Sequence, residues 1–204
     1  MGHEVIEDCP DYVLLRVGSG ETWDDIVELS VKNGWYGTEN LSLIPGEVGA
    51  SAVQNIGAYG AEVKDLIYEV EAIDTTTGDM VVKSNAECDY SYRQSRFKKE
   101  WKDRYIITHV IYKLAKKFTP RIDYGNIKAE LDKKHLTNPT AMDVRQAVIE
   151  IRRVKLPDPD IQGNAGSFFM NPIVEKEKFI EMTATYKDMP HYKIYDQQEK
   201  IPPR

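Results

Sequence analysis

Residues 44–60 read IPGEVGASAVQNIGAYG, and this glycine-rich stretch separates two parts of the chain with clear secondary-structure patterns. Its four glycines stand among small and apolar residues, a spacing that favours tight backbone turns over a long helix. The spacing matches neither the dinucleotide pattern G-x-G-x-x-G nor a P-loop, so a structural loop and a cofactor loop both remain open. The adjacent amides of Gln54 and Asn55, which can bind the edge of a heterocycle, favour a cofactor loop.

The segments on either side of this stretch predict a mixture of strands and helices. Tyr12–Val17 is rich in β-branched and aromatic residues and predicts a strand. Thr22 is placed to cap a helix that runs to Asn33. Further strands are predicted at 67–73, 80–83 and 105–114. A strand, a helix and a later hairpin indicate an α+β domain.

The character of the chain changes after Pro120, where helices are expected. Apolar residues at helical spacing predict helices at 127–133, from about 140 onward, and at 175–186. The second of these is broken by Leu156-Pro157-Asp158-Pro159. We expect a domain boundary close to this break.

The composition is that of a soluble globular protein, with 41% apolar and 29% charged residues. A net charge of −6 and scattered cationic residues disfavour a nucleic-acid partner, because phosphate binding requires clustered Lys and Arg. No apolar run approaches a membrane span, and no signal-peptide pattern is found. Cys9 and Cys88 form no C-x-x-C pair, and although a disulfide between them stays open, we expect a cytoplasmic protein. The histidines lack metal-pair spacing, so no metal site is expected.

Two further segments carry residues with chemical potential. In the segment YSYR at 90–93, an arginine beside two tyrosines could hold a carboxylate, while the alternative is a surface arginine stacked on tyrosine. In the segment GNAGSFFMNP at 163–172, small residues lead into Ser167, and two phenylalanines would anchor the loop to a core. Ser167 could donate a proton, but no G-x-S-x-G pattern or neighbouring His marks it as a nucleophile. A plain loop with an aromatic anchor remains the alternative.

Taken in order along the chain, these segments resemble the UDP-N-acetylenolpyruvoylglucosamine reductase family, known as MurB. The resemblance extends from about Tyr12 to about Ile201, and its most specific part is 163–172. The matching segments are ENLSLIPG at 39–46 continuing to Gly60, YRQS at 92–95 with FK at 97–98, DYG at 123–125, KLPDP at 155–159 and GNAGSFFMNP at 163–172. The resemblance implies an α+β fold with the second subdomain of a vanillyl-alcohol-oxidase-type FAD-binding domain over 1–135. A linker helix and the beginning of the substrate-binding domain would occupy 136–204.

The resemblance also implies a reaction and a set of site residues. NADPH would reduce FAD, and the hydride would then pass to the enolpyruvyl methylene carbon of UDP-N-acetylglucosamine enolpyruvate, giving UDP-N-acetylmuramate for peptidoglycan. Arg93 matches the catalytic residue that polarises the substrate carboxylate, and Ser167 matches the residue that protonates the neighbouring carbon. The residues that match FAD contacts are Pro45, Gly46, Gly49, Ala50, Ser51, Gln54, Asn55, Gly57, Tyr59 and Gly60. The residues that match substrate or nicotinamide contacts are Tyr92, Tyr124, Arg152, Lys155, Asn171 and Tyr192.

Two departures from the family pattern concern the ends of the sequence. The Gly-Ser-Asn segment that grips the FAD pyrophosphate in the family is not found, and Lys200-Ile201-Pro202 is not followed by the domain that supplies a catalytic glutamate. We therefore expect the chain alone to be inactive or nearly so. The alternatives are another flavin oxidoreductase of the same superfamily and a non-catalytic nucleotide-sugar or flavin-binding remnant. The parent enzyme is expected to be a monomer without nucleic-acid or membrane partners.

Overall fold

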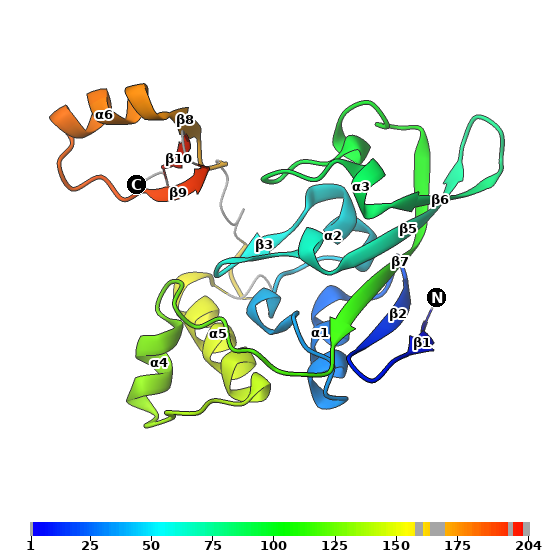
Figure 1. Ribbon diagram of the computed structural model, residues 1–204, viewed down its shortest axis with the longest axis horizontal. Coiled ribbons are helices and arrows are strands. Elements are labelled where there is room, and N and C mark those ends of the chain that lie inside the picture. The colour runs from blue at the N-terminus through cyan, green and yellow to red at the C-terminus, as the bar shows by residue number, and fades with distance from the viewer. Residues whose placement is uncertain (1, 158–160, 164–169, 196–197, 202–204) are drawn as a thin grey trace. The chain divides into compact units, whose positions relative to one another are not determined.

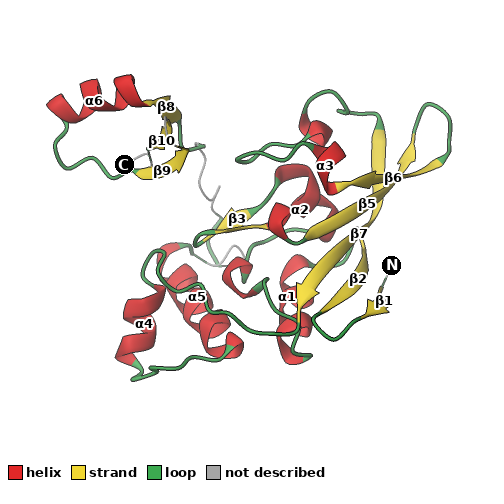
Figure 2. Ribbon diagram, viewed as in Figure 1, coloured by secondary structure: helices red, strands yellow, loops and turns green. Residues whose placement is uncertain are grey.

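The computed structural model describes residues 2–157, 161–163, 170–195 and 198–201, and the chain forms two compact units, Met1–Leu156 and Pro157–Arg204. Figures 1 and 2 show the helices and strands of each unit. The helix that follows Thr140, which from the sequence we assign to 136–204, packs within the first unit. Among the described residues, no helix combines the length and the apolar character needed to cross a membrane.

A five-stranded antiparallel sheet forms the centre of the first unit, with strand order β1-β2-β7-β5-β6. Alternate residues of a strand face opposite sides, and on β2 the residues Val13, Leu15 and Val17 are fully buried. Consecutive buried residues on β2 and β7 are consistent with their place inside the sheet, where each strand has a neighbour on both sides. The strands are β1 (His3–Asp8), β2 (Tyr12–Gly18), β5 (Ile67–Asp74), β6 (Met80–Ser84) and β7 (Tyr105–Ala115).

Helices α1 (Trp23–Lys32) and α2 (Val48–Gln54) supply the other side of the core. Trp23 and Val27 of α1 and Val48 and Ala52 of α2 are buried in the same cluster as the strands. Thr22 precedes α1 as predicted, but its side chain makes no capping hydrogen bond. The short elements between the main ones are η1 (Glu39–Leu41), β3 (Gly57–Ala58), β4 (Ala61–Glu62), η2 (Val63–Asp65), α3 (Asn85–Cys88) and η3 (Arg96–Lys98).

The opposite face of the sheet carries polar contacts between strands. Arg16 lies between the buried residues of β2 and therefore faces away from the core. Its guanidinium donates to both carboxylate oxygens of Glu71 on β5, at 2.9 and 2.6 Å. Its Nη2 also lies 2.9 Å from Nδ1 of His109 on β7. This group joins three strands without contributing to the core below them.

Helices α4 (Ile127–Lys133) and α5 (Ala141–Lys155) form a second buried cluster in the first unit. Ile127 and Leu131 of α4 pack against the apolar positions of α5, and Tyr59 packs at the edge of the cluster. A capping box at Thr140 begins α5, because its hydroxyl accepts from the N–H of Asp143 while that carboxylate accepts from the N–H of Thr140. The helix pair thus reaches the end of the glycine-rich stretch.

The second unit contains helix α6 (Lys176–Thr185) and a three-stranded sheet of order β8-β10-β9. Its strands are β8 (Ile173–Glu175), β9 (Tyr192–Tyr195) and β10 (Gln198–Lys200). Ile201 is buried and donates its backbone N–H to the carbonyl of Pro172 at 3.0 Å. This hydrogen bond holds the residue after β10 against the residue before β8.

Most elements expected from the sequence are present in the structure, which also contains elements that are not expected. The strands at 12–17, 67–73, 80–83 and 105–114 and the helices at 127–133, after Thr140 and at 175–186 are confirmed within one or two residues. Strand β1 is not predicted, because it is exposed along its whole length and has no apolar face. A short helix, α2, forms inside the glycine-rich stretch, where only turns are expected.

Candidate functional site

The glycine-rich loop, defined here as residues 43–60, consists of two turns around helix α2. The loop begins at Leu43, whose φ of 56° lies in the left-handed region, and Gly46 follows with a φ of 114°. After α2 the chain turns again at Asn55 and at Tyr59, with φ of 46° and 47°. Left-handed backbone is unfavourable for residues with a side chain, so surrounding contacts must hold this shape.

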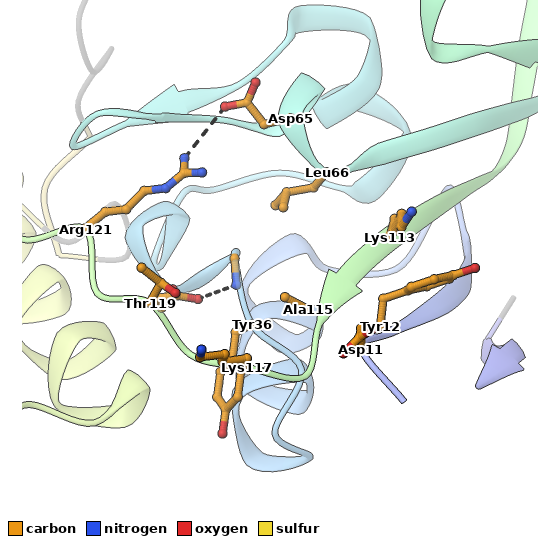
Figure 3. A pocket seen from close by; sticks show the side chains of 12 residues that line it. Asp11, Tyr12, Tyr36, Asp65, Leu66, Lys113, Ala115, Lys117, Thr119 and Arg121 are labelled. Carbon is orange, nitrogen blue, oxygen red and sulfur yellow. Dashed lines mark hydrogen bonds and ion pairs between the residues drawn. The ribbon is translucent and has the colours of Figure 1, made fainter. Parts of the chain in front are cut away.

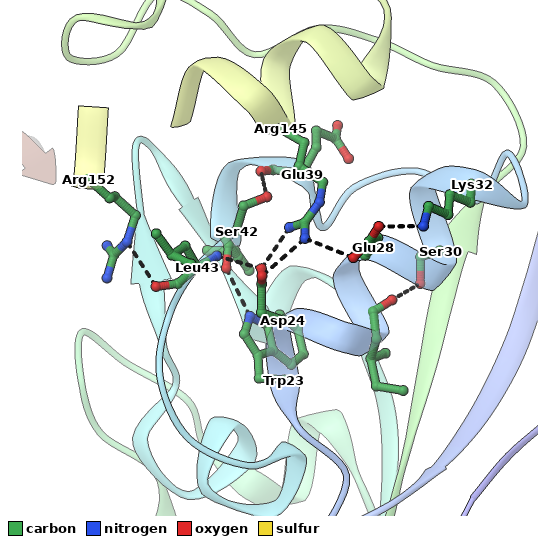
Figure 4. A network of polar contacts seen from close by, with 12 residues as sticks. Trp23, Asp24, Glu28, Ser30, Lys32, Glu39, Ser42, Leu43, Arg145 and Arg152 are labelled. Carbon is green, nitrogen blue, oxygen red and sulfur yellow. Dashed lines mark hydrogen bonds and ion pairs between the residues drawn. The ribbon is translucent and has the colours of Figure 1, made fainter. Parts of the chain in front are cut away.

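The first turn of α1 supplies such contacts, as Figure 4 shows. The backbone N–H of Trp23 donates to the carbonyl of Gly46 at 3.0 Å, and its indole Nε1 donates to the carbonyl of Leu41 at 2.9 Å. The carboxylate of Asp24 accepts from the N–H of Leu43 at 2.5 Å. The start of the glycine-rich loop is therefore fixed by side chains and backbone of a buried helix.

A cavity of about 180 Å³ opens beside this loop. Four residues that the family resemblance assigns to cofactor binding line it, namely Pro45, Ala50, Ser51 and Gln54. Ser51 forms a buried wall, because its hydroxyl donates to the carbonyl of Val48 and lies 2.9 Å from the hydroxyl of Tyr112. The remaining lining residues are Trp23, Ile44, Glu47 and Ile56.

Two glycines of the loop differ in what surrounds them. A β-carbon at Gly46 would have no atom within 4 Å, so the backbone there is open to an approaching ligand. A β-carbon at Gly49 would come within 2.9 Å of Cβ of Ser19, and the N–H of Gly49 donates to the carbonyl of Ser19. Gly49 therefore allows α2 to approach the end of β2, a role within the protein itself.

The side chain of Asn55 is engaged by the protein. Its amide nitrogen donates to the carboxylate of Glu62 at 2.9 Å and to the carbonyl of Ser91 at 2.8 Å. Its amide oxygen accepts from the N–H of Lys64 at 3.1 Å. Gln54 is exposed and lines the cavity, so of the two residues it is the one left available to a ligand.

Arg93 is half-buried against the second turn of the loop. Its guanidinium donates to the carbonyls of Asn55, at 3.2 Å, and Gly57, and it lies over the ring of Tyr92 at 5.3 Å. In the described part of the chain no carboxylate forms an ion pair with it. The arrangement leaves a positive charge, oriented by backbone carbonyls, next to the glycine-rich loop.

Tyr124 is brought to the same turn from a distant segment. A β-carbon at Gly60 would lie 3.2 Å from Cβ of Tyr124, so the backbone of the loop packs directly on this side chain. Asn40 fixes the two segments together, because its amide donates to the carbonyls of Tyr59 at 2.9 Å and Arg121 at 2.8 Å. The predicted substrate residue Tyr124 and the predicted catalytic residue Arg93 thus adjoin the same short turn.

Arg152 reaches the other end of the loop from helix α5. Its Nε donates to the carbonyl of Leu43 at 3.1 Å, and burial lowers the pKa of its guanidinium. Among the described residues, no carboxylate lies within ion-pair distance of it. Lys155, one turn further along α5, is exposed. A second cation with limited hydration therefore lies beside the loop.

The remaining predicted residues belong to the second unit or to undescribed positions. Asn171 is half-buried, and the ring of Tyr192 on β9 has the ammonium of Lys200 at 5.5 Å from its centre. Ser167 lies outside the described residues. No group of three or more potential metal ligands occurs among the described residues.

A larger cavity of about 540 Å³, shown in Figure 3, lies in the first unit and contains none of the predicted site residues. Its charged lining is balanced, with three basic and three acidic side chains: Lys113, Lys117, Arg121, Asp11, Glu39 and Asp65. Arg121 pairs with Asp65 at 3.7 Å, and Glu39 accepts from the N–H of Gly37 at 2.7 Å. The balance of charge gives no indication of the ligand class, so the smaller cavity is the better candidate.

Comparison with known proteins gives a consistent assignment. A family model described as an FAD binding domain matches residues 1–84. The UDP-N-acetylenolpyruvoylglucosamine reductase of a Bacteroides fragilis strain is 51% identical over 98% of this chain and 60% of its own length. The chain is a homologue of these reductases. The reductase of Flavobacterium johnsoniae is 46% identical over the same shares, so the chain spans about 60% of the length of the curated relatives it matches.

A solved structure supports the fold of the reductases for this chain. The crystal structure of UDP-N-acetylenolpyruvylglucosamine reductase from Thermus caldophilus matches with a TM-score of 0.56 at 25% identity. The match covers 77% of this chain and 48% of that chain. The resemblance and the α+β FAD-binding fold predicted from the sequence are therefore confirmed.

The residues that hold the loop are not identified from the sequence. Asn40 and Leu43 lie inside the segment that resembles the reductases but carry no assigned role, and no role is predicted for Asp24 from the sequence. The sequence does carry a signal for Arg145, because this charged residue follows Val144 on the apolar side of a predicted helix. In the structure its side chain is buried. A charged residue on such a face requires a partner, which is Asp24.

Proposed function

We propose that this chain carries the flavin site and the carboxylate-binding residues of a reductase that converts UDP-N-acetylglucosamine enolpyruvate to UDP-N-acetylmuramate. The observation that carries the proposal is the setting of Arg93. Its guanidinium is held by the carbonyls of Asn55 and Gly57 and has no carboxylate partner among the described residues. A cation prepared in this way can bind the carboxylate of a substrate and stabilise negative charge that develops there.

The glycine-rich loop has the features that a flavin requires. Pro45, Ala50 and Gln54 line an open cavity beside it, and the backbone at Gly46 has free space where a side chain would otherwise stand. When bound, FAD supplies the transfer of a hydride taken from NADPH. Ala50 would contact the cofactor by van der Waals packing, and Gln54 could hydrogen-bond a ring edge.

Within this proposal the chain's own residues hold the substrate and move the proton. Arg93 binds the enolpyruvyl carboxylate, and Tyr124, beside Gly60, closes the same turn. Ser167 donates its hydroxyl proton to the carbon next to the carboxylate. A serine hydroxyl is a weak acid, so this transfer requires a strongly basic acceptor. Arg93 would stabilise the negative charge that this acceptor shares with the carboxylate. Arg152, Lys155, Asn171 and Tyr192 are proposed contacts of the UDP-sugar or the nicotinamide cofactor.

A cytoplasmic location is part of the proposal. Cys9 and Cys88 are both free thiols, which is usual in a reducing compartment. The chemistry requires NADPH and a nucleotide sugar, and no nucleic-acid or membrane partner is proposed. A monomeric state is likewise proposed and is checked by light scattering.

The first test is FAD binding by the purified chain, followed by flavin fluorescence and absorbance. We expect saturable binding that Ala50→Leu weakens, because the added side chain enters the cavity. The matched control is Ala86→Leu, an exposed alanine in the short helix α3. Absence of FAD binding, or equal binding by both variants, would contradict the proposed site.

The second test is oxidation of NADPH in the presence of FAD and UDP-N-acetylglucosamine enolpyruvate. Turnover that requires the enolpyruvyl group supports the reductase activity. Turnover with unrelated alcohols in its place would support another flavin oxidoreductase. FAD binding without turnover would agree with the expectation that this chain alone is inactive, whereas sustained turnover would contradict that expectation.

A further inference from the structure

Asp24 and Arg145 form an ion pair whose geometry is directed at the glycine-rich loop (Figure 4). Arg145 donates to both carboxylate oxygens of Asp24, at 2.6 and 3.0 Å. The same oxygen that receives the shorter of these bonds, Oδ1, also accepts from the N–H of Leu43. The pair therefore ends on a backbone atom at the first residue of the loop.

Leu43 is held on both sides of its backbone. Its φ of 56° is unfavourable for an L-residue, and no glycine relieves that strain. Its N–H is bound by Asp24, while its carbonyl accepts from Nε of Arg152. Loss of either contact would allow Leu43 to return to a more favourable conformation and would redirect the residues that follow it.

Both arginines come from one face of helix α5. Residues seven apart on a helix lie on the same side, so Arg145 and Arg152 face α1 and the loop together. Arg145 is 6% exposed at its side chain, and Glu28 of α1 lies 3.6 Å from its Nη2. The carboxylate of Asp24 therefore has few alternative orientations while α5 is in place.

We propose that Asp24 and Arg145 are positioning residues for the glycine-rich loop. Their ion pair fixes the left-handed conformation of Leu43, so that Ile44 and Pro45 line the cavity and the open backbone of Gly46 follows them in the form that accepts the flavin. Neither residue lines the cavity itself. The inference rests on the proposed function only for the identity of the ligand, because the order of the loop is measurable without any ligand.

The test compares Asp24→Ala with a control pair on the other face of the sheet. Glu71 accepts two hydrogen bonds from Arg16 and touches no part of the loop, so Glu71→Ala removes a similar pair at a distance. Hydrogen–deuterium exchange of the ligand-free chain reports the order of residues 41–49. We expect Asp24→Ala to accelerate this exchange about tenfold or more, while Glu71→Ala leaves it unchanged.

FAD titration provides the second readout. Asp24→Ala should raise the Kd for FAD about tenfold or more, and Glu71→Ala should lower only the melting temperature. Asp24→Asn keeps an oxygen for both Leu43 and Nη1 of Arg145, so it should recover most of the loop order and affinity. If Asp24→Ala does not fold, Arg145→Met serves in its place, since it removes the guanidinium and keeps much of the aliphatic volume.

The outcomes separate this inference from the proposed function. Exchange and affinity at wild-type values in Asp24→Ala, with a lower melting temperature as in Glu71→Ala, would overturn the positioning role. Faster exchange at 41–49 in a chain whose wild type does not bind FAD would support the positioning role and contradict the proposed flavin site.

Discussion

The backbone of Gly60 packs directly against the side chain of Tyr124, so that a β-carbon at position 60 would lie 3.2 Å from Cβ of Tyr124. The two residues are far apart in the sequence, and Asn40 holds their segments together through the carbonyls of Tyr59 and Arg121. This contact joins the end of the glycine-rich loop to Tyr124, which we propose as a substrate contact. The geometry at Gly60 is therefore expected to matter for both stability and ligand binding.

Replacing Gly60 by alanine should separate crowding from backbone strain. Gly60 has a φ of 79°, and Gly78, in the hairpin turn between β5 and β6, has a φ of 78° but no atom within 4 Å of a β-carbon. Gly78→Ala should cost about 1–2 kcal/mol from its left-handed backbone alone. Gly60→Ala should cost about 1–3 kcal/mol more, because Tyr124 must shift. Urea denaturation of both variants measures the difference, and equal losses would show that Tyr124 is not packed as described.

The proposed contact of Arg93 with the substrate carboxylate is tested by a conservative change. Arg93→Lys keeps the charge but loses the planar fork of donors, so two carbonyls and a carboxylate can no longer be bound together. We expect the affinity for UDP-N-acetylglucosamine enolpyruvate, measured by calorimetry, to fall about tenfold or more. The matched control is Arg96→Lys, which changes an arginine that stacks on Trp101 outside the loop. Similar losses in both variants would contradict a specific role for Arg93.

The two thiols should differ sharply in reactivity. Cys88 is fully buried, and burial raises the pKa of its thiol to about 11. Because the thiolate is the reactive form, Cys88 should be inert near pH 8, whereas the half-buried Cys9 should react. Titration with an aromatic disulfide reagent should detect one thiol in the native chain and both after unfolding. Rapid reaction of both in the native chain would contradict the described packing of helix α3.

The Asp24 carboxyl should contribute to the acid stability of the chain. Burial alone would raise its pKa, but the hydrogen bonds from Arg145 and Leu43 hold the pKa of Asp24 below its usual value. A carboxyl with a lowered folded-state pKa stabilises the fold above its unfolded value, about 3.9, and loses that contribution as the pH falls through the folded value. Asp24→Asn should therefore lower the urea midpoint at pH 7 and converge with wild type below about pH 4. A difference independent of pH would contradict this.

Glu39 should show the opposite dependence. Burial raises the pKa of its carboxyl, and the N–H groups of Glu39 and Gly37 only partly offset that effect. Its charged form therefore opposes folding at neutral pH, and this cost disappears as the pH falls through the raised folded value. Glu39→Gln keeps an acceptor for Gly37 and should raise the urea midpoint at pH 7, with the gain shrinking on acidification. A lower midpoint at pH 7 would show that the charge of Glu39 is stabilising.

The sequence predicts the sheet and the long helices well because their patterns are local. The β-branched and aromatic residues of β2 and the Thr140 cap of α5 are each visible within a few neighbouring residues. Strand β1 is missed because its order comes from pairing with β2 and not from an apolar face.

The site is only partly predictable, since its residues act through distant contacts. The resemblance assigns Arg93 and Tyr124 to the site, and both adjoin the glycine-rich loop in the structure. The pattern cannot show that Asn55 uses its amide within the protein, because Glu62 and Ser91 become its partners only on folding. The same holds for Asp24, whose partners are Leu43 and Arg145.

The ion pair between Asp24 and Arg145 joins residues 121 positions apart, and the bond from Arg152 to Leu43 spans 109 positions. During synthesis on the ribosome, the glycine-rich loop emerges long before helix α5. Until α5 has left the exit tunnel, the carboxylate of Asp24 lacks its hydrogen bonds from Arg145 and the carbonyl of Leu43 lacks its hydrogen bond from Arg152. The proposed flavin site of the nascent chain therefore forms late, and the cofactor is expected to bind after translation has passed α5.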